Sequence, residues 1–299
     1  MTRAEALGRG RARLAASPPA TPDPSPTPSL DASLILASLL GLRREELLAR
    51  PGEEVEVATL FRFEEAIARR AQGRPVAYLT GEKEFYGRVF SVSEAVLVPR
   101  PDTELLVELA LAEGDRIAAL GACPPRLHEC CVGSGAIALS IAAERPSWIL
   151  TASDISPAAL EVASRNASRL LPREREGGAP RLFAADLLDG LPGLPGSEGP
   201  FDLILANPPY VESALALELA ERWGEPLLAL DGGSDGLDLL RRLVPQAAAR
   251  LVRGGVLLIE ADGSQAPALR DFFAVAGLVD VRSEMDLAGI ERVTIGVLP

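Results

Sequence analysis

The chain has 299 residues, of which 47% are hydrophobic and 24% charged, so it can bury the core of one large or two ordinary domains. The formal net charge of −12 repels a phosphate backbone and argues against direct binding of nucleic acid. No apolar run approaches the roughly 18 residues of a membrane span, and three cysteines with one histidine provide neither a disulfide framework nor a zinc-ligand set. We expect a monomeric cytoplasmic protein that binds no metal.

We expect the N-terminal quarter of the chain, residues 1–75, to form a small helical domain. Residues 2–16 are Arg-rich but have a helical period and lack the apolar core of a secretory signal, so we expect a structural helix. Six prolines in 17–29 predict an extended linker or surface loop, because proline fixes φ and removes amide donors. Apolar residues then recur at helical spacing over 30–72.

Residues 76–100 change character and predict a β-hairpin connector. Aromatic and β-branched residues alternate there around Gly81 and Gly87. A helix is expected to open at Asp102-Thr103-Glu104, at the start of a third region, 101–299.

The third region alternates strands with helices, which predicts a mainly parallel sheet covered on both faces. The expected strands are 126–131, 148–153, 181–184, 201–206 and 254–260, with a closing pair at 278–284 and 292–298. The expected helices between them are 135–144, 157–171, 236–252 and 264–276. In such sheets ligands bind beyond the carboxyl ends of the strands, so the chemistry is expected there.

The first three strand ends suggest a site for a nucleotide-type cofactor. The first strand runs into the loop Cys131-Val132-Gly133-Ser134-Gly135, where glycines and a helix N-terminus allow a ligand to approach the backbone. The second ends in Asp154, which can accept from both ribose hydroxyls, and the third in Asp186, which can accept from an adenine amino group. The alternative is that the glycine loop is only a tight turn and that Asp154 and Asp186 only cap the helices that follow them. The missing third glycine disfavours a dinucleotide, and Glu129 fits the acidic position of adenosylmethionine enzymes.

The fourth strand end predicts the reacting group. Strand 201–206 leads into Asn207-Pro208-Pro209-Tyr210, where two prolines lock the backbone. The carbonyls of Asn207 and Pro208 and the Asn207 side-chain oxygen can accept hydrogen bonds, and Tyr210 offers a ring face. These groups suit a planar amide or amine nitrogen that must be aimed at a sulfonium methyl group. A loop that merely ends a strand is the alternative.

Several segments together resemble the PrmC/HemK family of protein-(glutamine-N5) methyltransferases. The resemblance begins near residue 30 and includes TGEKEFYG (80–87), VPRPDTELLVE (98–108), GSGAIALSIAAERP (133–146), ANPPYV (206–211) and ERVTIG (291–296). It implies an α/β, Rossmann-like class I methyltransferase domain with a seven-stranded mixed sheet. It also implies that S-adenosyl-L-methionine donates a methyl group to the glutamine side chain of the Gly-Gly-Gln motif in peptide chain release factors.

The resemblance also assigns the candidate residues. Contacts to the cofactor would come from Cys131, Val132, Gly133, Ser134, Gly135, Asp154, Asp186, Leu187 and Asn207. Asn207, Pro208, Pro209 and Tyr210 would hold the glutamine. Two interpretations of Glu260 are equally plausible, a residue that lines the site and a surface or capping residue, so it stays outside the catalytic set. The N-terminal helices and the connector would dock the partner protein.

Two departures from the family pattern stand out. Glu129 replaces the commoner aspartate, and Cys131 occupies the position of the first glycine. We predict that Cys131 adopts an ordinary negative φ and that cofactor binding survives, since a positive φ would cost about 1 kcal/mol or more. A ribosomal-protein glutamine methyltransferase remains a close alternative. An N6-adenine DNA methyltransferase and a non-catalytic binding protein are more distant alternatives.

Overall fold

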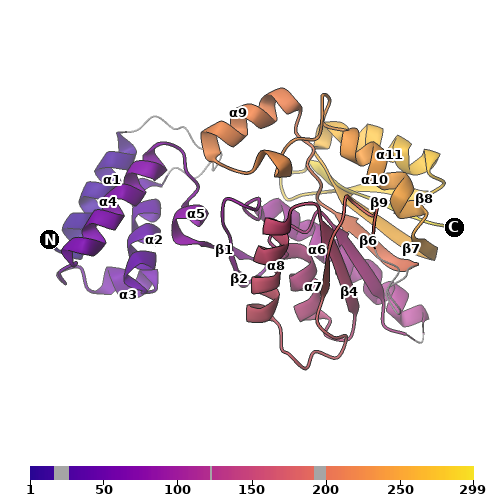
Figure 1. Ribbon diagram of the computed structural model, residues 1–299, viewed down its shortest axis with the longest axis horizontal. Helices are drawn as coiled ribbons and strands as arrows, with labels where there is room; N and C mark the ends of the chain where they lie inside the picture. Colours follow the sequence, from indigo (N-terminus) through magenta and orange to yellow (C-terminus); the bar gives the residue numbers. More distant parts are fainter. Residues whose placement is uncertain (17–26, 122, 192–199) are drawn as a thin grey trace. The chain divides into compact units, whose positions relative to one another are not determined.

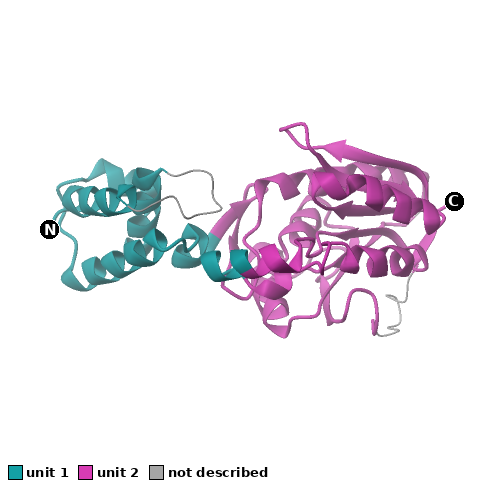
Figure 2. Ribbon diagram, turned by 90° about the horizontal axis from the view of Figure 1, so that it is seen from above, with its two compact units in different colours: residues 1–82, 218–225 teal, residues 83–217, 226–299 magenta. Residues whose placement is uncertain are grey.

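The protein is described here by a computed structural model covering residues 1–16, 27–121, 123–191 and 200–299 (Figure 1). The chain divides into two compact units, coloured separately in Figure 2. Unit 1 comprises Met1–Glu82 and Glu218–Glu225, and unit 2 comprises Lys83–Leu217 and Pro226–Pro299.

Unit 1 is helical, as expected for the first 75 residues. Its complete helices are α1 (Arg3–Ala15), α2 (Pro28–Leu40), α3 (Arg44–Ala49), α4 (Val57–Ala71) and α5 (Val76–Thr80). Helices α1, α2 and α4 pack against one another around a small apolar core that includes Leu36, Phe63 and Ile67. Arg70 of α4 and Asp31 of α2 form an ion pair with a nitrogen–oxygen distance of 2.7 Å, and both side chains are nearly or fully buried.

The predicted bounds of two segments in unit 1 were wrong. Most of the proline-rich 17–29 segment lies outside the described residues, but α2 already begins at Pro28. Proline suits the first turn of a helix, because its missing amide hydrogen has no intrahelical partner there. Residues 76–80 form the helix α5 where the hairpin connector was expected. Gly81, at φ 77°, ends this helix in the left-handed conformation.

Unit 2 opens with a hairpin and contains a seven-stranded mixed sheet. The strands are β1 (Glu82–Phe85), β2 (Arg88–Ser91), β3 (Arg126–Cys130), β4 (Ile149–Asp154), β5 (Arg181–Ala184), β6 (Phe201–Ala206), β7 (Leu251–Glu260), β8 (Val279–Met285) and β9 (Glu291–Val297). Tyr86 and Gly87 join β1 to β2 with positive φ at both positions, as a two-residue hairpin turn requires. The large sheet has the order β5-β4-β3-β6-β7-β9-β8, and β9 runs in the direction opposite to the other six strands.

Apart from α9, which only begins in unit 2, the helices of unit 2 follow the predicted alternation. They are α6 (Glu104–Leu120), α7 (Ala136–Glu144), α8 (Pro157–Leu170), α9 (Ser213–Trp223), α10 (Asp238–Ala248) and α11 (Ala266–Val275), with short 3-10 turns η1 (Pro101–Thr103), η2 (Leu227–Ala229) and η3 (Gly263–Gln265). Helix α9 was not predicted, and its last residues group with unit 1.

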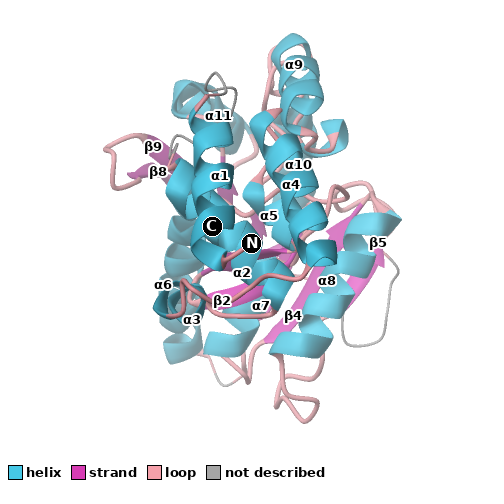
Figure 3. Cartoon of the chain, turned by 90° about the vertical axis from the view of Figure 1, so that its left-hand side faces the viewer, coloured by secondary structure: helices cyan, strands magenta, loops and turns pink. Residues whose placement is uncertain are grey.

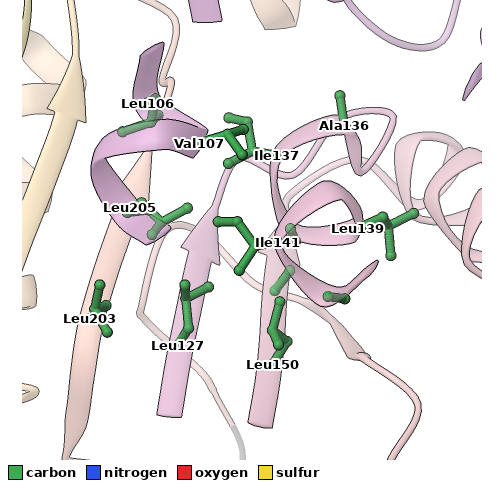
Figure 4. Packing of buried hydrophobic residues seen from close by; sticks show 14 of the residues in the cluster. Leu106, Val107, Leu127, Ala136, Ile137, Leu139, Ile141, Leu150, Leu203 and Leu205 are labelled. Atoms are coloured by element: carbon green, nitrogen blue, oxygen red, sulfur yellow. The ribbon is translucent and has the colours of Figure 1, made fainter. Parts of the chain in front are cut away.

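Alternating side chains of the parallel strands divide the core into two layers. On β6, Leu203 and Leu205 pack with α6 and α7, as Figure 4 shows, whereas Ile204 and Ala206 face the layer of α10 and α11. Helix α8 packs on β4 and β5 (Figure 3). Helices therefore cover both faces of the sheet, which confirms the predicted fold class.

The parallel arrangement brings the predicted functional segments together. Strands β3 to β7 all run in one direction, so their carboxyl ends lie at one edge of the sheet. The loop 131–135 follows β3, and residues 185–187 and 207–210 follow β5 and β6. Strands β4 and β7 end at Asp154 and Glu260.

Candidate active site

The loop after β3 has a left-handed backbone at every second residue. The φ angles are 58° at Cys131, 53° at Gly133 and 81° at Gly135. The prediction that Cys131 has an ordinary φ was therefore wrong. The positive φ at Cys131 turns the chain back beside β4, where the Val132 N–H donates to the Ser153 carbonyl at 3.0 Å. The turn needs this conformation whatever residue occupies it, which explains why glycine is suited to all three positions.

Asp154 and Glu129 hold the backbone on either side of this loop. The Asp154 carboxylate accepts from the Gly133 N–H and from the Ser156 N–H, both at 2.9 Å. Glu129 is buried, and it accepts from the Ala138 N–H in the first turn of α7 at 2.8 Å. Burial raises the pKa of both carboxyls, and these N–H donors oppose the increase. The carboxylate has about four lone-pair positions, so it can still accept from a further donor.

The segment after β5 supplies a second carboxylate. Leu187 also has a positive φ of 58°, and its carbonyl accepts from the Ser153 hydroxyl at 2.8 Å. Asp186 pairs with Arg242 of α10 at 2.6 Å, and its side chain is 43% exposed. Asp186 therefore has one oxygen on the arginine and one still able to accept from a ligand.

Asn207, after β6, is held by two side chains from distant segments. Its Nδ2 donates to Thr103 Oγ1 at 3.2 Å and to Glu260 Oε1 at 2.9 Å. The Thr103 hydroxyl donates to the same Glu260 oxygen at 3.0 Å. No described residue donates a hydrogen bond to Asn207 Oδ1. Burial raises the pKa of Glu260 to about 7, against the opposing hydrogen bonds and the charge of Arg292.

The rest of the Asn-Pro-Pro-Tyr segment is fixed mainly through its backbone. The Tyr210 carbonyl accepts from Gln265 Nε2 at 2.9 Å, and the next N–H, of Val211, donates to the Leu230 carbonyl at 2.9 Å. Burial, assisted by the negative charge of Glu260, raises the pKa of the Tyr210 hydroxyl above its ordinary value.

One cavity of about 330 Å³ in unit 2 collects most of the predicted residues. Its lining includes Glu129, Cys131, Val132, Gly133, Ser134, Asp154, Asp186, Leu187, Asn207 and Pro209. Three predicted residues, Gly135, Pro208 and Tyr210, do not line it. A Cβ on Gly135 would lie 2.8 Å from Leu139 Cδ1, so this glycine permits close packing of the loop on α7.

Sequence reasoning missed Thr103 and Arg242 as members of the site, and it left Glu260 undecided between the site and a surface or capping role. Glu260 ends a parallel strand, and this position was the available signal for it. Thr103 lies in the VPRPDTE segment, where its neighbour Glu104 accepts from the Tyr86 N–H at 2.8 Å and ties the hairpin to α6. Nothing in the sequence pairs Arg242 with Asp186.

The cavity suits a nucleoside that carries a charged side group. Apolar lining residues such as Val96, Leu97 and Leu239 provide packing surface, while Asp154 and Asp186 present acceptors. The described residues contain no group of three or more His, Cys, Asp or Glu side chains arranged to hold a metal ion. None of the helices in the described ranges has the length and apolar character needed to cross a membrane.

Comparisons with known proteins place the chain in a family. The PrmC N-terminal domain family matches residues 5–81, and the methyltransferase small domain family matches residues 125–223. A release factor glutamine methyltransferase from Burkholderia pseudomallei is 43% identical over 273 residues, covering 91% of this chain and 92% of the relative. Another, from Moorella thermoacetica, is 42% identical over 298 residues, covering 98% of this chain and 97% of that relative. The chain belongs to the PrmC/HemK family.

Membership of the PrmC/HemK family confirms the resemblance seen in the sequence. The helical segment matched by the N-terminal family corresponds closely to the first part of unit 1. Among solved structures, the hMettl16 catalytic domain in complex with MAT2A 3'UTR hairpin 6 has a TM-score of 0.54 at 13% identity, covering 82% of this chain and 83% of that chain. A likeness at this low identity shows the shared methyltransferase fold alone.

Proposed function

We propose that this chain transfers a methyl group from S-adenosyl-L-methionine to the side-chain amide nitrogen of the glutamine in the Gly-Gly-Gln motif of peptide chain release factors. It is proposed to act in the cytoplasm as a monomer. The observation that carries the proposal is the shared cavity: Asn207 and Pro209 line the same space as Asp154 and the glycine loop. The curated relatives at 43% and 42% identity bear the corresponding name.

The residues of the chain fit the methyl donor at its polar ends. We assign Asp154 to the ribose hydroxyls and Asp186 to the adenine amino group, with the loop of residues 131–135 beside them. When bound, the donor supplies an electrophilic sulfonium methyl group. Glu129 acts on this site through the backbone, because it holds the first turn of α7 in place.

The substrate nitrogen needs orientation more than a strong base. A primary amide nitrogen is neutral and its lone pair is delocalised, so acceptors on its N–H hydrogens must fix and polarise it. We assign this role to Asn207 Oδ1 and to the carbonyls of Asn207 and Pro208, which make no hydrogen bond with a described residue. The methylated nitrogen is acidic and releases its proton readily. Positioning is therefore expected to provide much of the rate acceleration.

We further propose that residues 1–75 select the protein partner, because the nucleoside cavity lies wholly in unit 2. Deleting them is expected to leave cofactor binding measurable by calorimetry and to abolish methylation of an intact release factor. Full activity of the deletion variant on the intact factor would refute this division of labour.

The function is tested by methyl transfer with purified proteins. Radiolabelled methyl donor is incubated with the wild type and either a release factor or ribosomal proteins. Incorporation is expected in the release factor and to disappear when its Gly-Gly-Gln glutamine is replaced by alanine. Asn207→Ala is the negative control. Incorporation only into ribosomal proteins would assign the chain to that substrate instead, and binding without turnover would make it a non-catalytic protein. A DNA substrate is disfavoured by the net charge of −12.

A further inference from the structure

The side-chain amide of Asn207 is locked by a closed set of hydrogen bonds. Both Nδ2 hydrogens have acceptors, one on Thr103 Oγ1 and one on Glu260 Oε1. The Thr103 hydroxyl hydrogen is also used, since it points to Glu260. Every polar side-chain hydrogen of Asn207 and Thr103 therefore has a partner.

The reversed orientation of the amide is strongly disfavoured. Turning the Asn207 amide by 180° would exchange Oδ1 and Nδ2. Oδ1 would then face the Glu260 carboxylate at about the present donor–acceptor separation of 2.9 Å, and Thr103 has its hydrogen committed to that carboxylate. Two acceptors would meet without a hydrogen between them. With Glu260 ionised, only one orientation satisfies the cluster, and it leaves Oδ1 for a ligand.

We propose that Glu260, assisted by Thr103, is a positioning residue that keeps Asn207 Oδ1 turned toward the substrate, so that the site accepts a nitrogen carrying hydrogen. This inference rests on the proposed function for the identity of the substrate amide. Glu260 itself need not touch the substrate, because it acts through the amide of Asn207.

The burial of Glu260 supports this assignment. The residue is 1% exposed at the end of β7, and its Oε2 has no hydrogen-bond partner among the described residues. A carboxylate in such a place costs free energy, and an apolar residue would avoid that cost. The charged and titratable groups that act on it are Arg292 of β9, Asp102 of η1 and Tyr210. None of these is hydrogen-bonded to it. Both hydrogen bonds that Glu260 accepts come from the other two members of the cluster, Thr103 and Asn207.

The kinetic test compares Glu260→Gln with Glu260→Leu. Glutamine keeps an oxygen that can accept both hydrogen bonds, and its kcat is expected to stay within about fivefold of wild type. Leucine removes the acceptor, so kcat is expected to fall roughly 10- to 100-fold, on the scale of one or two lost hydrogen bonds to a charged group. The KM for the methyl donor should change less than about threefold. The matched control is Glu291→Leu on β9, where a carboxylate pairs with Arg270 away from this cluster.

A second measurement does not depend on turnover. The side-chain amide hydrogens of Asn207, assigned in ¹⁵N spectra by their loss in Asn207→Asp, are expected to exchange with water at least about tenfold more slowly in wild type than in Glu260→Leu. Equal exchange rates would overturn the inference even if no substrate were methylated. Equal loss of kcat in the glutamine and leucine variants would also overturn it. A kcat of Glu260→Leu equal to that of wild type would overturn it as well. The same holds if Glu260→Leu loses methyl-donor affinity and thermal stability in parallel with kcat. Failure of wild type to methylate release factors would overturn only the proposed function.

Discussion

At position 131 a glycine variant should be more stable than an alanine variant, which is the reverse of the usual order. At an ordinary φ, alanine is more stable than glycine by about 0.5–1 kcal/mol, because glycine loses more backbone entropy on folding. At the φ of 58° seen here, a Cβ costs about 1–2 kcal/mol. Both variants lose the same sulfur, so its packing cancels. We expect Cys131→Gly to be more stable than Cys131→Ala by about 0.5–1 kcal/mol.

The assay is urea unfolding followed by tryptophan fluorescence. The chain has two tryptophans, and Trp148 lies in unit 2 while Trp223 lies in unit 1. A Trp223→Phe background therefore reports the unfolding of unit 2 alone. With a slope of about 2 kcal/mol per molar urea, the two midpoints should differ by roughly 0.25–0.5 M. An alanine variant as stable as the glycine variant, or more stable, would refute a left-handed Cys131.

Three further predictions concern buried contacts. Burial raises the pKa of Glu260 from 4.5 to about 7, so between these pH values the unfolded chain has lost this proton while the folded chain still holds it. The stability of the wild type should therefore fall by up to about 3 kcal/mol relative to Glu260→Gln between pH 4 and 7 and change little above pH 7, measured by denaturation at each pH. Asp31→Ala leaves Arg70 buried without this ion-pair partner and should destabilise unit 1 by about 3–5 kcal/mol, read from Trp223 fluorescence in a Trp148→Phe background. Gly114→Ala places a Cβ 2.0 Å from Trp148 and should lower unit 2 stability by about 1–3 kcal/mol despite better helix propensity; an unchanged urea midpoint would contradict that contact.

Much of unit 2 could be predicted because its information is local. Each strand core is a short apolar run that ends where a polar or glycine-rich segment begins, so Asp154, Asp186 and Asn207 could be placed at strand ends. The parallel alternation then implied that these ends share one edge of the sheet. The five parallel strands have boundaries close to those expected, apart from β7, which begins three residues earlier than its apolar core.

The remaining parts of the site depend on contacts between distant residues. Thr103 and Asn207 are 104 positions apart and Asn207 and Glu260 are 53 apart, and no periodicity connects them. The positive φ of Cys131 was missed for a related reason. It is set by where Val132 must donate on β4, whereas the side chain alone favours the opposite sign. Helix α9 has a modest apolar pattern, and its last residues join a unit whose other members lie before residue 83.

The discontinuity of unit 1 has a consequence for synthesis of the chain. Its helices are complete by residue 82, but the segment Glu218–Glu225 that belongs with them is made only after strands β3 to β6. At common translation rates the interval is on the order of 10 s. During that time the nascent helical unit lacks part of its native contacts. Its final consolidation on the ribosome must therefore wait until much of the sheet sequence has been translated.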